Sequence, residues 1–62
     1  MANFYYIIVT LLGGATKTFE GRLNTIAGPD EEGRKKFKEL CNTLDAAEAI
    51  GIIEGYRVWY ES

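Results

Sequence analysis

The chain contains no histidine and a single cysteine, Cys41, among its 62 residues. A lone cysteine cannot form a disulfide within the chain, and a tetrahedral metal site needs several sulfur or nitrogen ligands. Nucleophilic catalysis at Cys41 would also lack the imidazole base that commonly activates a thiol. We therefore expect no cofactor and no metal, and we interpret Cys41 as a small buried hydrophobic residue.

Long apolar runs and strong net charge are also missing. No stretch of about 18 apolar residues occurs, so no segment is expected to span a membrane. Nine acidic and seven basic residues give a net charge of −2, which is too small to indicate a nucleic-acid binder or a charge mimic of DNA. The scarcity of cysteine favours a reducing, cytoplasmic location.

The short chain limits the size of the hydrophobic core. Its 62 residues are enough for one domain, so residues 1–62 are predicted to form a single compact α+β domain. A domain of this length buries only about 60% of the surface that its unfolded chain exposes. Small domains often gain stability by oligomerisation, which makes a homodimer one expectation for this chain.

The first third of the chain is predicted to form a β-hairpin. Residues 4–12 are aromatic and β-branched, and Gly13-Gly14 permits the positive φ angles of a two-residue turn. Residues 15–23 then form the second strand. A two-residue turn pairs Ile8 with Phe19 and points both toward the core. With this pairing, the opposite face of the first strand carries Tyr5, Ile7, Val9 and Leu11.

A helix is predicted after a loop at residues 24–28. Pro29 suits the first helical position, and the acidic residues 30–32 suit the first helical turn. The basic residues within 34–38 are interleaved with acids, so we interpret them as a solvent-exposed helix face. An apolar stripe with a period of 3.6 residues consists of Phe37, Leu40, Cys41 and Leu44.

Two interpretations remain for the last third of the chain. Asp45 and Glu48 resemble a capping box, which predicts a second helical segment over residues 46–54 that ends at Gly55, followed by a final strand. This gives a two-layer ββααβ fold with a three-stranded antiparallel sheet in the order 2-1-3 and the helix packed on one face. The alternative, ββαββ, makes residues 50–53 a strand.

The sheet face that the helix leaves uncovered is the candidate functional surface. A single layer of helix covers one face of a sheet, and contiguous exposed apolar residues commonly mark a binding site. Tryptophan, tyrosine and arginine are also enriched at interface hot spots. In the competing interpretation, Trp59 turns inward or the second helical segment covers this face. The predicted partner-binding residues are Tyr5, Ile7, Val9, Leu11, Arg22, Arg57 and Trp59.

The function predicted from these features is a non-catalytic protein–protein interaction module. Glu20 and Glu61 could share one sheet face, but carboxylates there are more often cross-strand charge pairs than catalytic groups, so no enzyme is expected. The small size favours an inhibitor that occludes a larger protein machine. A phage-encoded antagonist of a bacterial enzyme or defence complex is one setting for such an inhibitor.

Two alternatives use the same sheet. One is a homodimeric structural module. The other is single-stranded nucleic-acid binding, in which aromatic side chains stack on bases and basic side chains contact phosphates. The stacking residues would be Tyr5, Trp59 and Tyr60, and the phosphate contacts Lys17, Arg22 and Arg57.

Overall fold

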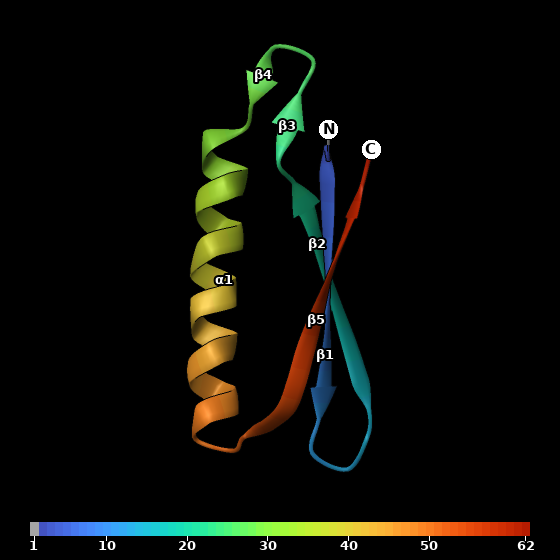
Figure 1. Ribbon diagram of the computed structural model, residues 1–62, viewed down its shortest axis with the longest axis vertical. Coiled ribbons are helices and arrows are strands. Elements are labelled where there is room, and N and C mark those ends of the chain that lie inside the picture. Colours follow the sequence, from blue (N-terminus) through green and yellow to red (C-terminus); the bar gives the residue numbers. More distant parts are fainter. Residues whose placement is uncertain (1) are drawn as a thin grey trace.

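The computed structural model describes residues 2–62, so Met1 of the predicted 1–62 domain lies outside the described residues. A β-hairpin of β1 (Phe4–Leu11) and β2 (Thr16–Arg22) is extended by β5 (Ile53–Glu61), which pairs with the other edge of β1. The antiparallel sheet has the order β2-β1-β5, and α1 (Glu31–Ala49) lies along one face of it (Figure 1). The predicted α+β class, the strand order and the single helical layer are confirmed.

A second, very short hairpin precedes the helix. Its strands are β3 (Asn24–Thr25) and β4 (Gly28–Pro29), in a segment that was predicted to be a loop. Pro29 therefore belongs to β4, and the helix begins two residues later than expected. Asp30 is the N-cap: its carboxylate accepts a hydrogen bond from the backbone N–H of Gly33 at 2.9 Å. In Figure 1 this hairpin extends past the ends of the three-stranded sheet.

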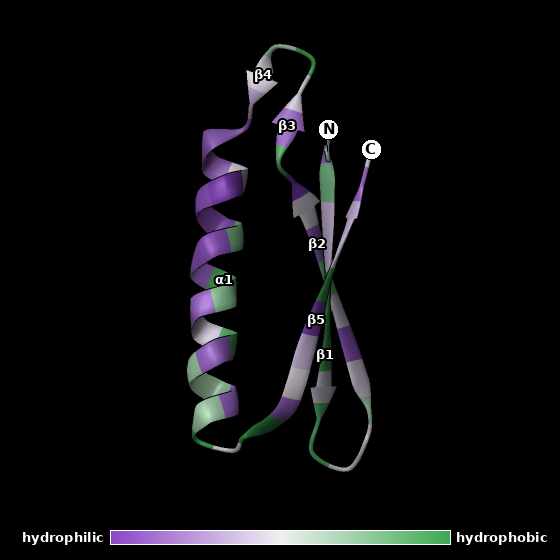
Figure 2. Ribbon diagram, in the orientation of Figure 1, coloured by the Kyte–Doolittle hydropathy of each residue, from purple (hydrophilic) through white to green (hydrophobic). Residues whose placement is uncertain are grey.

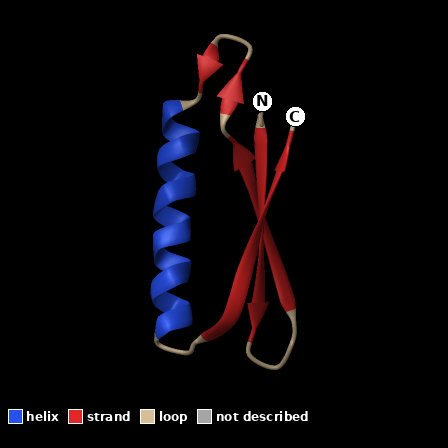
Figure 3. Ribbon diagram, viewed as in Figure 1, coloured by secondary structure: helices blue, strands red, loops and turns tan. Residues whose placement is uncertain are grey.

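The two predicted helical segments form one continuous helix. Asp45 lies inside α1 and does not cap a second helix, because the weak helix formers Asn42 and Thr43 do not interrupt the first one. The tertiary contacts of the apolar stripe outweigh this local preference. Figure 3 shows the single helix and the sheet as two distinct layers.

The helix ends in a Schellman motif at Gly51, and not at Gly55 as predicted. Gly51 has a φ of +78°, its N–H donates to the Glu48 carbonyl at 3.1 Å, and the N–H of Ile52 donates to the Ala47 carbonyl at 3.0 Å. Gly55 instead lies in β5, opposite Thr10. The chain therefore leaves the helix early enough to form a nine-residue strand.

The turn between β1 and β2 contains three residues, Leu12-Gly13-Gly14, where two were predicted. The N–H of Gly14 donates to the Leu11 carbonyl at 3.0 Å, and the N–H of Leu11 donates to the Ala15 carbonyl at 2.7 Å. Gly13 and Gly14 both have positive φ, +93° and +95°, which glycine adopts readily in a tight turn. The extra loop residue shifts the pairing by one position.

This shift reverses the two faces of β1. Ile8 pairs with Thr18 and not with Phe19, and Ile7 is the residue opposite Phe19. Because side chains alternate along a strand, a shift of one residue exchanges the faces. The placement of Tyr5, Ile7 and Val9 on the uncovered face was therefore wrong: all three are buried beneath α1, and Leu11 lies partly exposed at the end of the strand.

The core lies between this face of β1 and the helix. Ile7 has no exposed surface, and the other buried apolar residues around it are Tyr5, Val9, Leu44 and Ile53. The predicted stripe of α1 faces the sheet, and its members Phe37, Leu40 and Cys41 are partly buried against the core. Figure 2 shows the apolar positions of α1 along its sheet-facing side.

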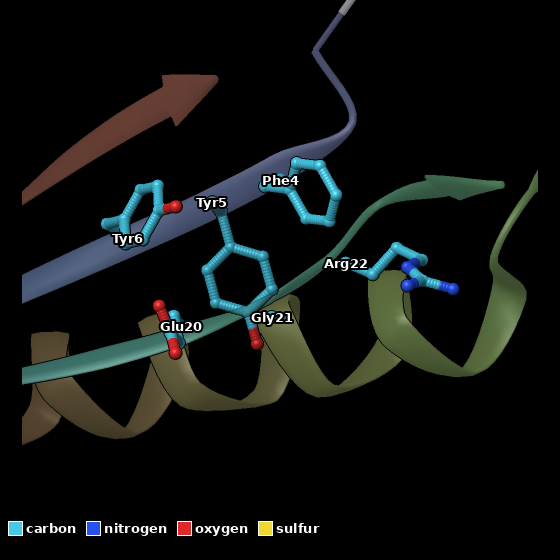
Figure 4. Close-up of a pocket in the computed structure, with 6 residues that line it drawn as sticks. All are labelled: Phe4, Tyr5, Tyr6, Glu20, Gly21 and Arg22. Carbon is cyan, nitrogen blue, oxygen red and sulfur yellow. The ribbon is translucent and has the colours of Figure 1, made fainter. Parts of the chain in front are cut away.

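Two glycines allow close packing around this core. The ring of Tyr5 lies over Gly21, its partner on β2, where a Cβ atom would overlap the ring (Figure 4). A Cβ atom on Gly33 would overlap the backbone carbonyl of Arg22. The first turn of α1 can therefore approach the end of β2 because residue 33 has no side chain.

A polar network holds the start of the helix against the sheet. Arg34 donates from Nε to the Leu23 carbonyl at 2.9 Å and from its terminal nitrogen to Oδ1 of Asn24 at 2.6 Å. The buried Asn24 in turn donates to the Ala2 carbonyl. Arg34 is exposed, as predicted for the basic helix face, and it also connects α1 with β3 through these hydrogen bonds.

Introducing a glutamate at each of two neighbouring positions of β1 tests the pairing of β1 with β2. Ile7→Glu places a carboxylate in the core without a partner. The free-energy cost of burying this charge should exceed the small stability of the domain, so the variant should unfold. Ile8→Glu places the same carboxylate beside Arg57 on the uncovered face and should leave the fold intact. Circular dichroism and thermal unfolding of both variants provide the measurement. A folded Ile7→Glu variant would contradict the pairing.

Replacement of Gly33 by alanine tests the close approach of α1 to β2. Alanine is a better helix former by about 1 kcal/mol, but overlap with the Arg22 carbonyl is expected to cost about 1–3 kcal/mol. We expect a net loss of stability, visible as a lower Tm. Asn42→Ala, at an exposed position of the same helix, is the control and should raise Tm slightly. An increase in Tm for both variants would argue against the contact.

Candidate interaction surface

The face of the sheet opposite α1 is not covered by any element in the described chain, residues 2–62, and we call it the open face. The alternation of side chains about the buried Ile7 determines which residues lie on it. The open face consists of Phe4, Tyr6, Ile8 and Thr10 from β1, Thr16, Thr18, Glu20 and Arg22 from β2, and Arg57, Trp59 and Glu61 from β5.

These residues form rows across the three strands. In the row nearest the chain termini, Phe4 lies between Arg22 and Glu61. In the next row, Tyr6 lies between Glu20 and Trp59. Each row therefore has an aromatic residue at its centre and a charged residue on at least one side.

The third row has an aliphatic centre. Ile8 lies between Thr18 on β2 and Arg57 on β5. The centres of the three rows thus form an apolar stripe along β1, with polar and charged groups along both of its edges.

The apolar stripe is accessible to a partner. Trp59 is 57% exposed and Phe4 is 37% exposed, while Tyr6 and Ile8 are half-buried by their neighbours on the same face. A shallow hollow of about 380 Å³ is lined by Tyr6, Ile8, Thr18, Trp59, Tyr60 and Glu61. A large aromatic group beside a hollow is a typical arrangement at protein interfaces.

A second hollow of about 350 Å³ lies at the β1–β2 side of the sheet, and its lining residues are drawn in Figure 4. Phe4, Tyr6, Glu20 and Arg22 contribute to it, and the guanidinium carbon of Arg22 lies 5.8 Å from the centroid of the Phe4 ring. This is within the range of a cation–π contact, which holds the charge close to the apolar stripe.

The open face carries equal numbers of acidic and basic groups. Glu20 and Glu61 are balanced by Arg22 and Arg57, and all four are exposed. The two carboxylates do share one face and flank the central strand, as expected from the sequence. They lie on opposite edge strands, with β1 between them.

The predicted partner-binding set is divided by the structure. Arg22, Arg57 and Trp59 lie on the open face, but Tyr5, Ile7 and Val9 do not, and Leu11 lies at the end of β1. The residues that the sequence interpretation missed are Phe4, Tyr6 and Ile8. Both faces of β1 are apolar, so only the length of the turn distinguishes them.

Two residues of the nucleic-acid alternative also lie on the helix side of the sheet. The ammonium group of Lys17 is 5.5 Å from the centroid of Phe19, and the ring of Tyr60 is 6.1 Å from that of Phe37. In the alternation of the strands, these two residues and Tyr5 therefore belong to the face opposite Trp59, although Tyr60 also borders the hollow beside Trp59.

The shifted pKa values cluster away from the open face, where α1 contacts β5. The hydroxyl of Tyr56 donates to Oδ1 of Asp45 at 2.5 Å, and this hydrogen bond raises the pKa of Tyr56 from 10.0 to about 12. Burial, with a contribution from Asp45, raises the pKa of the Cys41 thiol. Burial also raises the pKa of Tyr5. A raised pKa keeps Cys41 in its weakly nucleophilic thiol form.

Among residues 2–62, no group of three or more histidine, cysteine, aspartate or glutamate side chains is placed to hold a metal ion. No helix in the same range is long and apolar enough to cross a lipid bilayer.

The Tyr56–Asp45 hydrogen bond predicts a pH dependence of stability. Because the pKa of Tyr56 is higher in the folded state than the ordinary 10.0, the stabilisation is complete below about pH 10 and is lost as the pH rises through about 12. Asp45→Asn should lower the pKa of Tyr56, as measured by ultraviolet absorbance of tyrosinate. Tyr56→Phe removes the titrating hydroxyl of Tyr56, so the difference from the wild-type curve gives the contribution of Tyr56. An unchanged curve for Asp45→Asn would contradict the assignment.

The comparisons with known proteins do not assign the open face to any family. The chain matches no protein-family model, and no curated protein or solved structure is significantly similar to it. A functional proposal must therefore come from the shape, the polarity and the charge of the open face.

Proposed function

We propose that this protein is a non-catalytic protein–protein interaction module that binds its partner through the open face. One observation carries the proposal: an apolar stripe of Phe4, Tyr6 and Ile8, widened by the exposed Trp59, lies on a sheet face that no element covers in residues 2–62. Exposed apolar groups on one face lose their contact with water when a second protein covers them.

The charges on the open face favour a protein partner over a nucleic acid. Glu20 and Glu61 flank the same stripe as Arg22 and Arg57, so a phosphate backbone that approached the arginines would also meet the two carboxylates. Single-stranded nucleic-acid sites are instead positively charged grooves with stacking residues. A protein partner with a mixed-charge rim matches this distribution better.

Inhibition by occlusion is the form of this function that we propose when the partner is a larger protein. A small module that binds through its open face would act by covering a surface of its target. The rigid sheet beneath the open face fixes the positions of Tyr6, Ile8 and Trp59 and so reduces the entropy that binding costs.

Affinity capture from a lysate tests the use of the open face. The baits are the wild type, Trp59→Ala and Ile8→Glu, with Asn42→Glu on the exposed side of α1 as the matched control. Trp59→Ala and Ile8→Glu should reduce capture of a specific protein by about tenfold or more, because hot-spot truncations commonly cost at least 2 kcal/mol. Asn42→Glu should capture as the wild type does.

Salt and nuclease treatment distinguish the kinds of partner. Capture through the apolar stripe should persist at moderate salt, whereas contacts with phosphates weaken steeply as salt increases. Equal capture by wild type and Ile8→Glu, with both baits folded, would show that the open face is not the binding surface. Capture that disappears after nuclease treatment would contradict a protein partner.

A further inference from the structure

The charges of the open face are arranged with opposite signs on its two edges. In the row of Phe4, the β2 edge carries Arg22 and the β5 edge carries Glu61. One row further along, the β2 edge carries Glu20, and the β5 edge carries Arg57 in the row after that. Moving away from the row of Phe4, the charge on the β2 edge therefore changes from positive to negative. On the β5 edge it changes from negative to positive.

This arrangement is complementary to itself. When two copies are placed face to face about a two-fold axis parallel to β1, the β2 edge of each copy lies over the β5 edge of the other. Arg22 of each copy then faces Glu61 of the second copy. The same axis brings Glu20 of each copy diagonally next to Arg57 of the second copy, one row away. A two-fold interface repeats every contact, so both kinds of contact occur twice.

The apolar groups match under the same operation. The central strands lie over each other, so Phe4, Tyr6 and Ile8 each meet their own counterpart. Trp59 of each copy lies over Glu20 on the β2 edge of the other, with Thr18 and Arg22 one row away on either side. Two sheets that pack in this way bury their apolar faces as a β-sandwich does.

We propose that the partner of the open face is a second copy of this chain, bound face to face about a two-fold axis parallel to β1. This inference rests on the proposed function, because it names the partner of the same surface. A dimer would also compensate for the small hydrophobic core of a 62-residue domain, because the second copy adds an apolar layer on the other side of the sheet.

The charges favour this axis over the other face-to-face two-fold arrangement. An axis perpendicular to β1 and centred at Tyr6 would place each edge over the same edge of the second copy. Glu61 of each copy would then face Arg57 of the other, but Glu20 would face Glu20, and Arg22 would face Thr18. Like charges in contact oppose association, and the parallel axis has no such contact between two Glu20 carboxylates.

The size of the open face predicts a dimer that dissociates on dilution. Three strands about 4.8 Å apart and eight residues long at about 3.4 Å per residue give a flat area of roughly 400 Å². Stable complexes typically bury about 800 Å² per partner, and smaller interfaces are usually weak or transient. The dimer should therefore be measured over a wide range of protein concentration.

Charge reversal on the two edges provides the test, with sedimentation velocity as the measurement. The wild type should change from monomer to dimer as its concentration increases. R22E places two glutamates opposite each other on both edges of the interface, and E61R places two arginines there. Each variant alone should weaken dimerisation by about tenfold or more. An equimolar mixture of R22E and E61R should dimerise again, because the mixed dimer restores an opposite charge at every such contact.

Matched controls separate this effect from a change in net charge. K35E and E39R change the net charge by the same amounts as R22E and E61R, at exposed positions of α1. Both should dimerise as the wild type does, because α1 lies on the other face of the sheet. Thermal unfolding of every variant confirms that a monomeric variant is folded.

Each other outcome would overturn the inference. A wild type that stays monomeric at every concentration excludes the second copy as partner. If Trp59→Ala and Ile8→Glu still abolish capture of another protein in that case, the proposed function stands and only the identity of the partner was wrong. Dimerisation that survives R22E and E61R places the contact on another surface. Loss of dimerisation in E61R but not in R22E would exclude the parallel axis.

Discussion

The pairing of β1 with β2, set by the turn Leu12-Gly13-Gly14, is the constraint on which the rest of the structure depends. Three loop residues place Ile7 opposite Phe19 and direct Tyr5, Ile7 and Val9 toward the helix. One loop residue fewer would direct the other set of apolar residues inward. The two positive φ angles of the turn are easily adopted because both positions are glycine. The core and the open face are therefore two consequences of one local geometry.

The helix is held to the sheet at both ends by polar contacts, in addition to the apolar stripe between them. At its start, Gly33 allows close packing and Arg34 bonds to the Leu23–Asn24 segment. Near its end, Asp45 accepts a hydrogen bond from Tyr56, and Gly51 turns the chain toward β5. Such contacts matter in a chain this short, because its apolar core alone leaves little excess stability.

The open face follows from the number of layers. A single helix covers one face of a three-stranded sheet, and the residues that alternate with the core residues are left on the other face. On this chain the central residues of that face are aromatic and aliphatic, and each edge carries one acidic and one basic residue. Phe4 and Trp59 exposed on such a face have a large apolar area to lose on binding. The two proposals concern how that area is covered, first by a protein partner and then by a second copy of the chain.

The sequence by itself determined the α+β class, the order of the strands and the single helical layer, because these depend on the length and periodicity of the apolar segments. It also placed Arg22 and Arg57 on the uncovered side and left open whether Trp59 joins them; in the structure all three lie there. Only the tertiary structure decided the faces of β1 and the continuity of α1. Both faces of β1 are apolar, so alternation along the strand could not distinguish Tyr5, Ile7 and Val9 from Phe4, Tyr6 and Ile8. The weak helix formers Asn42 and Thr43 remain helical because packing against the sheet stabilises the whole helix more than their local preferences oppose it.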